Sequence, residues 1–238
     1  MTNLPTDIHD LLRKINESFN PISIFLYGSK AREDWVKDSD YEVGILYLPT
    51  SKISRSELKE LNHINNLRLY PFNYDDFLTY NLDTPFPKIV YMYSLLSKSK
   101  TLSGKKVVEN LKLPSISLID LLEEAVFQIS RAYTAVLSER ENDLVNARAG
   151  FSKSVLYSAR VYILIKNNKF PAEYDEIVKE FIKLKIDGEY KQLINHAFSV
   201  RNGADLDPRM LYKNITFINT VVIKEIKDRL KTGNEVVL

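Results

Sequence analysis

Two apolar runs flank a polar segment in residues 22–48, which read ISIFLYGSKAREDWVKDSDYEVGILYL. The first run, residues 22–27, has the length and composition of a buried strand. Gly28 and Ser29 break this strand, and the polar, helix-compatible residues 30–37 predict a short helix after the break. The second run, residues 43–48, predicts another buried strand. The segment is therefore expected to fold as strand, turn, helix and strand.

The turn at Gly28 and Ser29 has the chemistry of a phosphate site. Backbone N–H groups at the start of a helix lack partners within the helix, and the helix dipole adds positive potential there. Gly28 lets the backbone approach an anion closely, and the Ser29 hydroxyl can donate a hydrogen bond to a phosphate oxygen. The sequence therefore predicts a phosphate-binding turn.

Asp40 and Glu42 open the second strand, and they are the candidate metal ligands. Residues i and i+2 of a strand point to the same face, so the two carboxylates are expected side by side. Hard carboxylate oxygens are the ligands that Mg²⁺ prefers. A phosphate turn beside a metal pair points to phosphoryl or nucleotidyl transfer. Asp38 precedes the pair and is interpreted as a loop or capping carboxylate.

This combination resembles the DNA polymerase β-like nucleotidyltransferase superfamily, and within it the aminoglycoside nucleotidyltransferases of the kanamycin type. The resemblance rests on Tyr27-Gly28-Ser29, on Arg32 three residues later, and on Ser39-Asp40-x-Glu42 before an apolar strand. It is strong over residues 20–48, looser over residues 73–78 and 101–104, and only architectural beyond them.

The resemblance implies a Mg²⁺-dependent transfer of a nucleoside monophosphate, AMP from ATP or the equivalent from another triphosphate, to a small molecule. Asp40 and Glu42 would bind the metal, while Gly28, Ser29 and Arg32 would hold the phosphates. The alternative for Arg32 is an exposed helix residue paired with Glu33 or Asp34. The acceptor would be an aminoglycoside-like hydroxyl compound, as in antibiotic resistance, and the kanamycin type implies a homodimer.

Two departures from the family pattern stand out. The predicted strand 66–72 carries no acid where the superfamily usually has a third carboxylate. Asp75 and Asp76 follow it and are interpreted as a helix cap, the alternative being that one of them swings in as the third carboxylate. On the first long helix of the second half, Phe127 stands where the kanamycin type has its general base. Glu124, one turn earlier, is the candidate base, and the alternative is that Glu123 and Glu124 simply face solvent. Arg131 aligns with a family lysine that contacts nucleotide phosphates.

The composition is that of an ordinary globular protein, with 45% hydrophobic and 27% charged residues. A net charge of +2 argues against a nucleic-acid partner, and the absence of cysteine excludes disulfides and thiolate metal sites. Residues 1–10 do not resemble a signal peptide, and no apolar stretch approaches the ~18 residues of a membrane span. We therefore expect a cytoplasmic protein without a membrane partner.

The sequence predicts an α+β protein of two domains. Residues 1–114 mix strand and helix patterns without a regular βαβ repeat, which indicates a mixed-sheet catalytic domain. Residues 115–238 carry helical periodicity, with helices expected over 117–140, 144–165, 173–185, 189–201 and 209–230. Two other functions stay open: a nucleotidyltransferase that modifies a protein, as antitoxin-type enzymes do, and a nucleotide-binding regulator that has lost its chemistry.

Overall fold

The computed structural model describes residues 4–37, 39–51, 53–233 and 238. The chain divides into two compact units, Met1–Pro114 and Ser115–Leu238, and each is described by itself. Asp38, interpreted above as a capping carboxylate, lies outside the described residues.

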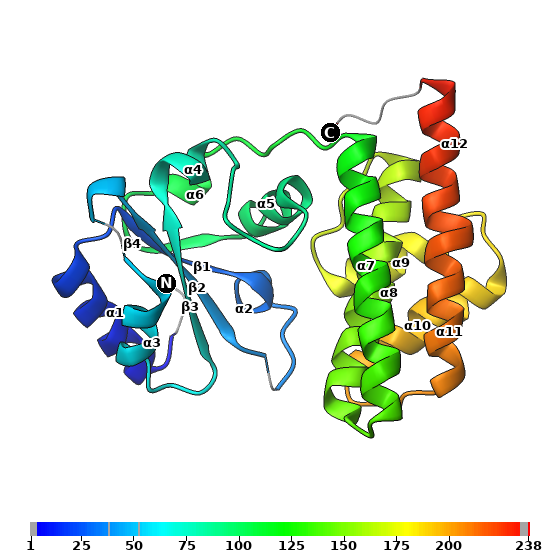
Figure 1. Cartoon of the computed structure of the whole chain (residues 1–238), viewed down its shortest axis with the longest axis horizontal. Coiled ribbons are helices and arrows are strands. Elements are labelled where there is room, and N and C mark those ends of the chain that lie inside the picture. Colours follow the sequence, from blue (N-terminus) through cyan, green and yellow to red (C-terminus); the bar gives the residue numbers. More distant parts are fainter. Residues whose placement is uncertain (1–3, 38, 52, 234–237) are drawn as a thin grey trace. The chain divides into compact units, whose positions relative to one another are not determined.

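The first unit is built on a four-stranded sheet with the strand order β3-β2-β1-β4 (Figure 1). Its strands are β1 (Ser23–Tyr27), β2 (Tyr41–Tyr47), β3 (Leu67–Asn73) and β4 (Lys100–Gly104). Strand β1 is antiparallel to both β2 and β4, whereas β2 and β3 are parallel. The predicted mixed sheet is therefore confirmed.

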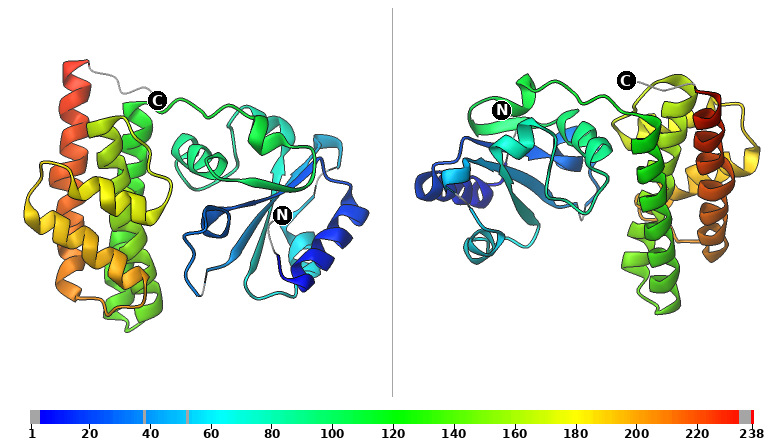
Figure 2. Two further views of the ribbon diagram at one scale, coloured as in Figure 1. Left: turned by 180° about the vertical axis from the view of Figure 1, so that it is seen from behind. Right: turned by 45° about the horizontal axis from the view of Figure 1, so that its top comes forward.

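Helices cover both faces of this sheet, as Figures 1 and 2 show. On one face α1 (Thr6–Phe19) and α3 (Arg55–Leu61) pack on Ile24, Val43 and Ile45. On the other, α4 (Tyr74–Leu78), α5 (Lys88–Leu96) and α6 (Val107–Asn110) pack on Phe25 and Leu46. Alternate residues of β1 and β2 thus serve opposite cores, because side chains along a strand alternate in direction. Glu42 belongs to the face of Leu46, which α4, α5 and α6 cover.

The helix after β1 is shorter than the sequence predicted. Helix α2 spans Gly28–Arg32, so the prediction of a helix over residues 30–37 is wrong in its extent. The helix ends because Glu33 adopts a left-handed conformation with φ 69°, and residues 34–36 have no regular structure. A single 3-10 turn, Pro49–Ser51, follows β2.

The second unit is helical throughout its described part, as the sequence predicted. Its helices are α7 (Leu118–Arg140), α8 (Leu144–Asn167), α9 (Tyr174–Ile182), α10 (Gly188–Arg201), α11 (Pro208–Phe217) and α12 (Lys224–Thr232). A π-helical segment, Ile218–Ile223, joins α11 to α12, where a single helix over 209–230 was expected. Helix α7 begins with a capping box, in which Ser117 Oγ accepts from Asp120 N and the Asp120 carboxylate accepts from Ser117 N.

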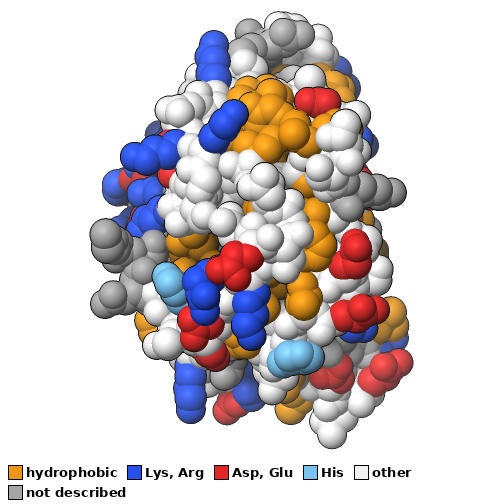
Figure 3. Space-filling view, turned by 90° about the vertical axis from the view of Figure 1, so that its left-hand side faces the viewer, with side chains coloured by type: hydrophobic (Ala, Val, Ile, Leu, Met, Phe, Trp, Pro, Cys, Tyr) orange, Lys and Arg blue, Asp and Glu red, His pale blue; other side chains and the backbone are white. Residues whose placement is uncertain are grey.

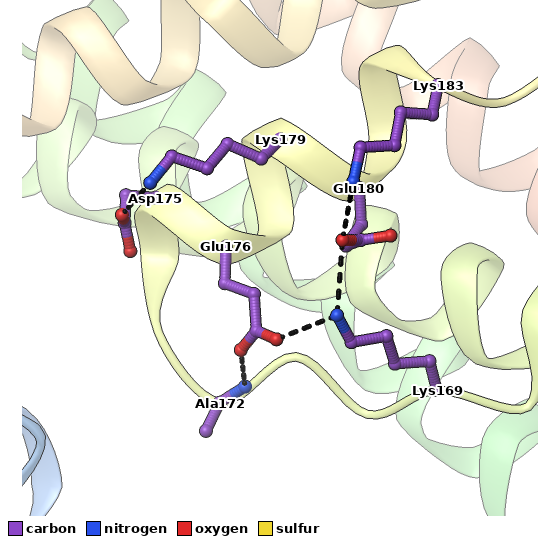
Figure 4. A network of polar contacts seen from close by, with 7 residues as sticks. All are labelled: Lys169, Ala172, Asp175, Glu176, Lys179, Glu180 and Lys183. Carbon is purple, nitrogen blue, oxygen red and sulfur yellow. Dashed lines mark hydrogen bonds and ion pairs between the residues drawn. The ribbon is translucent and has the colours of Figure 1, made fainter.

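Charged side chains form local ion pairs on the surface. In the second unit Lys169 lies between Glu176 and Glu180, which ties the α8–α9 loop to α9 (Figure 4). On the face drawn in Figure 3, basic side chains gather toward the upper left and acidic ones toward the right, and both lie together below the centre. Among the described helices, none combines the length and the apolar character that a membrane span requires.

Candidate active site

The two halves of the central motif meet at Gly28 and Glu42. Strand pairing sets Tyr27 opposite Glu42, so the residue after Tyr27 lies beside the Glu42 side chain. Gly28 has φ +72°, and a Cβ added to it would stand 1.8 Å from Oε2 of Glu42. Only glycine fits here, because any larger residue would meet both the strained backbone and the carboxylate. The phosphate turn and the metal strand predicted from the sequence therefore touch.

Asp40 lies two residues before Glu42, and an arginine from β3 lies beside this pair of residues. In the parallel register of β2 and β3, Arg68 is the partner of Glu42. The Arg68 guanidinium reaches Asp40, with Nε 3.3 Å from Oδ2. Sequence reasoning noted that this strand lacks an acid but gave Arg68 no role, because the role depends on strand register.

The residues at this place fit a divalent ion that arrives with a nucleotide. Mg²⁺ in phosphoryl-transfer sites is commonly bound by one or two carboxylates, with substrate phosphates and water completing its shell. Asp40 and Glu42 supply two such carboxylates, and the missing Cβ of Gly28 lets Oε2 of Glu42 lie directly against the turn. No set of three or more His, Cys, Asp or Glu residues with metal-site geometry occurs in the described part of the chain. The pair is therefore suited to sharing a metal with a ligand.

The basic residues of helix α2 have partners within the unit. Arg32 pairs with Asp34 through Nε and Oδ2 at 3.2 Å, and its side chain is only 8% exposed. The pairing with Asp34 matches the alternative interpretation, although that interpretation placed Arg32 on the exposed surface. Lys30 Nζ lies 3.7 Å from the centroid of the Trp35 ring. A phosphate role for Arg32 stays a prediction.

Two tyrosines flank Glu42 on the same face of the sheet. Burial raises the pKa of Tyr27 well above its ordinary value, with Tyr91 and Glu42 adding to the effect. Burial also raises the pKa of Tyr70, and the negative charge of Glu42 raises it further. Each phenol carries an O–H group that can donate a hydrogen bond on this face of the sheet.

Asp75 and Asp76 lie away from the pair, at the first turn of α4. The Asn73 side chain accepts hydrogen bonds from the backbone N–H groups of both residues, so a capped helix starts here as expected, but its cap is Asn73 rather than the two aspartates. Asn73 is the register partner of Tyr47, five residues along β2 from Glu42. At ~3.3 Å per strand residue this is a separation of roughly 17 Å, so neither acid is the missing third carboxylate.

In the second unit Glu124 is buried, at 5% exposure, inside the helical core. Burial raises its pKa, while Arg160, a hydrogen bond from Gln128 and Arg131 act in the opposite direction. Gln128 Nε2 donates to Glu124 Oε1 at 2.8 Å, and Arg131 in turn donates to Gln128 Oε1 at 3.1 Å. The alternative in which both glutamates face solvent is wrong for Glu124, although Glu123 is exposed.

Aromatic rings surround the arginines near Glu124. Arg160 is buried, with its guanidinium 4.5 Å from the ring centroids of both Tyr157 and Phe170. The Arg131 guanidinium carbon lies 5.0 Å from the Phe127 ring centroid. Phe127 therefore packs beside Arg131, the candidate phosphate contact predicted from the sequence. Sequence reasoning missed Arg160, yet a lone charge in the apolar run 155–165 was a visible signal, because buried charges are rare unless paired.

The comparisons with known proteins support the fold. The chain is similar to spectinomycin adenyltransferase AAD(9) from Enterococcus faecialis, whose crystal structure was solved with ATP and spectinomycin. The TM-score is 0.57 at 11% sequence identity, and the alignment covers 94% of this chain and 100% of that one. No protein-family model matches the sequence. No curated protein matches it either. The shared architecture is a mixed-sheet α+β domain followed by a helical region.

Proposed function

We propose that this protein is a Mg²⁺-dependent nucleotidyltransferase that moves AMP from ATP to a hydroxyl of a small, aminoglycoside-like molecule. The observation that carries the proposal is the contact between Gly28 and Glu42, which brings a phosphate-type turn against a carboxylate of the predicted metal pair. The fold similarity to an adenyltransferase adds support, since that enzyme was crystallised with ATP and spectinomycin.

In this proposal the first unit carries the nucleotide chemistry. Asp40 and Glu42 hold Mg²⁺, which when bound neutralises charge on the triphosphate. Gly28 and Ser29 hold the β- and γ-phosphates, and Arg32 adds positive charge beside them. An acceptor oxygen then forms a bond to the α-phosphorus while the bond to the bridging oxygen breaks, and pyrophosphate leaves with its electron pair.

Residues of the second unit are assigned to the acceptor and the phosphates. Glu124 is the candidate general base for the acceptor hydroxyl, because burial raises its pKa toward the range in which a carboxylate accepts protons effectively. Gln128 orients it through the hydrogen bond to Oε1. Arg131 is the candidate contact to the nucleotide phosphates.

Pyrophosphate release from ATP and Mg²⁺ tests this function directly. The assay is run with and without acceptors that include spectinomycin and kanamycin, on the natural protein and on Asp40→Asn. Asp10→Asn, an exposed aspartate on α1, is the matched control. We expect acceptor-dependent release that Asp40→Asn reduces at least about a hundredfold and Asp10→Asn leaves unchanged.

The other outcomes separate the remaining functions. Pyrophosphate release that depends on a protein in a lysate fraction, rather than on a small molecule, would identify the acceptor as a protein. Metal-dependent ATP binding without release for any acceptor would identify a nucleotide-binding regulator and contradict the transferase proposal.

A further inference from the structure

The carboxylate pair has an unusual neighbour in Arg68. Its Cα is in register with that of Glu42, and its side chain shares the face of the sheet that holds both carboxylates. The ion pair of 3.3 Å to Asp40 involves side chains that are 52% and 37% exposed. A cation therefore already lies against one of the two candidate metal ligands before any metal or nucleotide binds.

The charges at this place differ from those of a three-carboxylate site. Asp40 and Glu42 bring two negative charges and Arg68 brings one positive charge, which leaves one net negative charge among the three. No third acid completes a metal-binding cluster within the described ranges. A second divalent ion bound to Asp40 would have to displace the guanidinium or lie next to it, where the two like charges repel and solvent reduces the repulsion because the pair is partly exposed.

From this arrangement, and resting on the proposed function, we infer that Arg68 takes the place of a second metal ion. The site holds one divalent cation per nucleotide, and the guanidinium supplies the second positive charge beside Asp40. Arg68 also weakens the attraction of the empty pair for a free divalent cation, so the metal enters together with the triphosphate. Arg68 is thus a positioning residue that sets metal stoichiometry and the order of binding.

The first test counts ions. Equilibrium dialysis of the full chain with Mn²⁺ and a non-cleavable α,β-methylene ATP gives the ratio of bound Mn²⁺ to bound nucleotide. We expect a ratio of one, and a ratio of two would overturn the inference. If the ratio is two but acceptor-dependent pyrophosphate release is found, the transferase function stands and only the role of Arg68 falls. If no Mn²⁺ binds with the nucleotide, the metal site itself is refuted, and both proposals fall.

The second test measures Mn²⁺ affinity without nucleotide. Arg68→Gln removes the charge and is expected to tighten Mn²⁺ binding about tenfold, a modest figure because the pair is partly exposed to solvent. Arg68→Lys keeps the charge and should bind Mn²⁺ as the natural protein does. Arg13→Gln is the matched control, because Arg13 is an exposed arginine in an ion pair with Glu17 on α1. Equal affinities for Arg68→Gln and the natural protein would contradict the inference.

Discussion

The Glu42 carboxylate lies against the Cα of Gly28, so closely that a Cβ at position 28 would stand 1.8 Å from Oε2. This contact joins two sequence features that are fourteen positions apart in number but adjacent through the pairing of Tyr27 with Glu42. The contact holds the turn at Gly28 against the start of β2, and substitutions at either residue test its role.

Gly28→Ala should abolish nucleotidyl transfer and also destabilise the first unit. The backbone at φ +72° costs roughly 1–2 kcal/mol for a residue with a Cβ, and the clash with Glu42 adds to that cost. Urea unfolding and pyrophosphate release measure the two effects. Gly233→Ala is the matched control, because Gly233 has φ +68° with nothing within 4 Å of an added Cβ. Activity of Gly28→Ala equal to that of Gly233→Ala would show that the contact is not needed.

ATP with Mg²⁺ should raise the thermal unfolding midpoint, because a ligand that binds only the folded state stabilises it by about 2.7 kcal/mol at a hundredfold excess over Kd. Glu42→Gln should remove most of the part that depends on Mg²⁺, since it takes away one of the two proposed metal ligands. Glu60→Gln, an exposed glutamate on α3, should keep the full shift. A shift that EDTA does not reduce would argue against a metal at this pair.

The unfolding free energy should depend on pH through Glu124. A carboxyl whose pKa is higher in the folded chain binds more protons when folded, so stability falls as pH rises from the ordinary value of about 4.5 through the folded pKa. Replacing Glu124 by Gln should remove this fall, whereas Glu123→Gln on the exposed side of α7 should keep it. Urea unfolding from pH 4 to pH 7 provides the measurement, and parallel curves for all three proteins would refute the assignment.

The capping box of α7 should contribute measurably to stability. Ser117→Ala removes the oxygen that accepts from Asp120 N, which typically costs about 1 kcal/mol. Ser130→Ala lies on the exposed side of the same helix and should be neutral or slightly stabilising, since alanine is the better helix former. Chemical unfolding followed by circular dichroism distinguishes the two. Equal stabilities would mean that this helix start does not depend on its cap.

The sequence was informative where the relevant residues are close along the chain. The strand, turn and strand around Gly28 and Asp40 were predictable, because apolar runs and a Gly-Ser break are local signals. Helix α2 ends at Arg32 because Glu33 takes a left-handed conformation, which composition does not reveal. The prediction of a helix over residues 30–37 failed for that reason.

Contacts between distant segments could not be predicted in the same way. Arg68 reaches Asp40 only because β2 and β3 pair in one particular parallel register, and an apolar pattern does not specify a register. The burial of Glu124 rather than Glu123 depends on which side of α7 packs against the other helices. The two glutamates are neighbours in sequence, so helical spacing alone does not predict which of them is buried. The interpretation in which both face solvent therefore stayed open.

The most direct test of the central claim follows the phosphorus atoms of ATP. The protein is incubated with Mg²⁺, an acceptor such as spectinomycin, and ATP labelled with ³²P at either the α or the γ position. We predict that the α label appears in the acceptor product, that the γ label leaves as pyrophosphate, and that Asp40→Asn blocks both. Transfer of the γ label to the acceptor would contradict nucleotidyl transfer and indicate a kinase reaction instead.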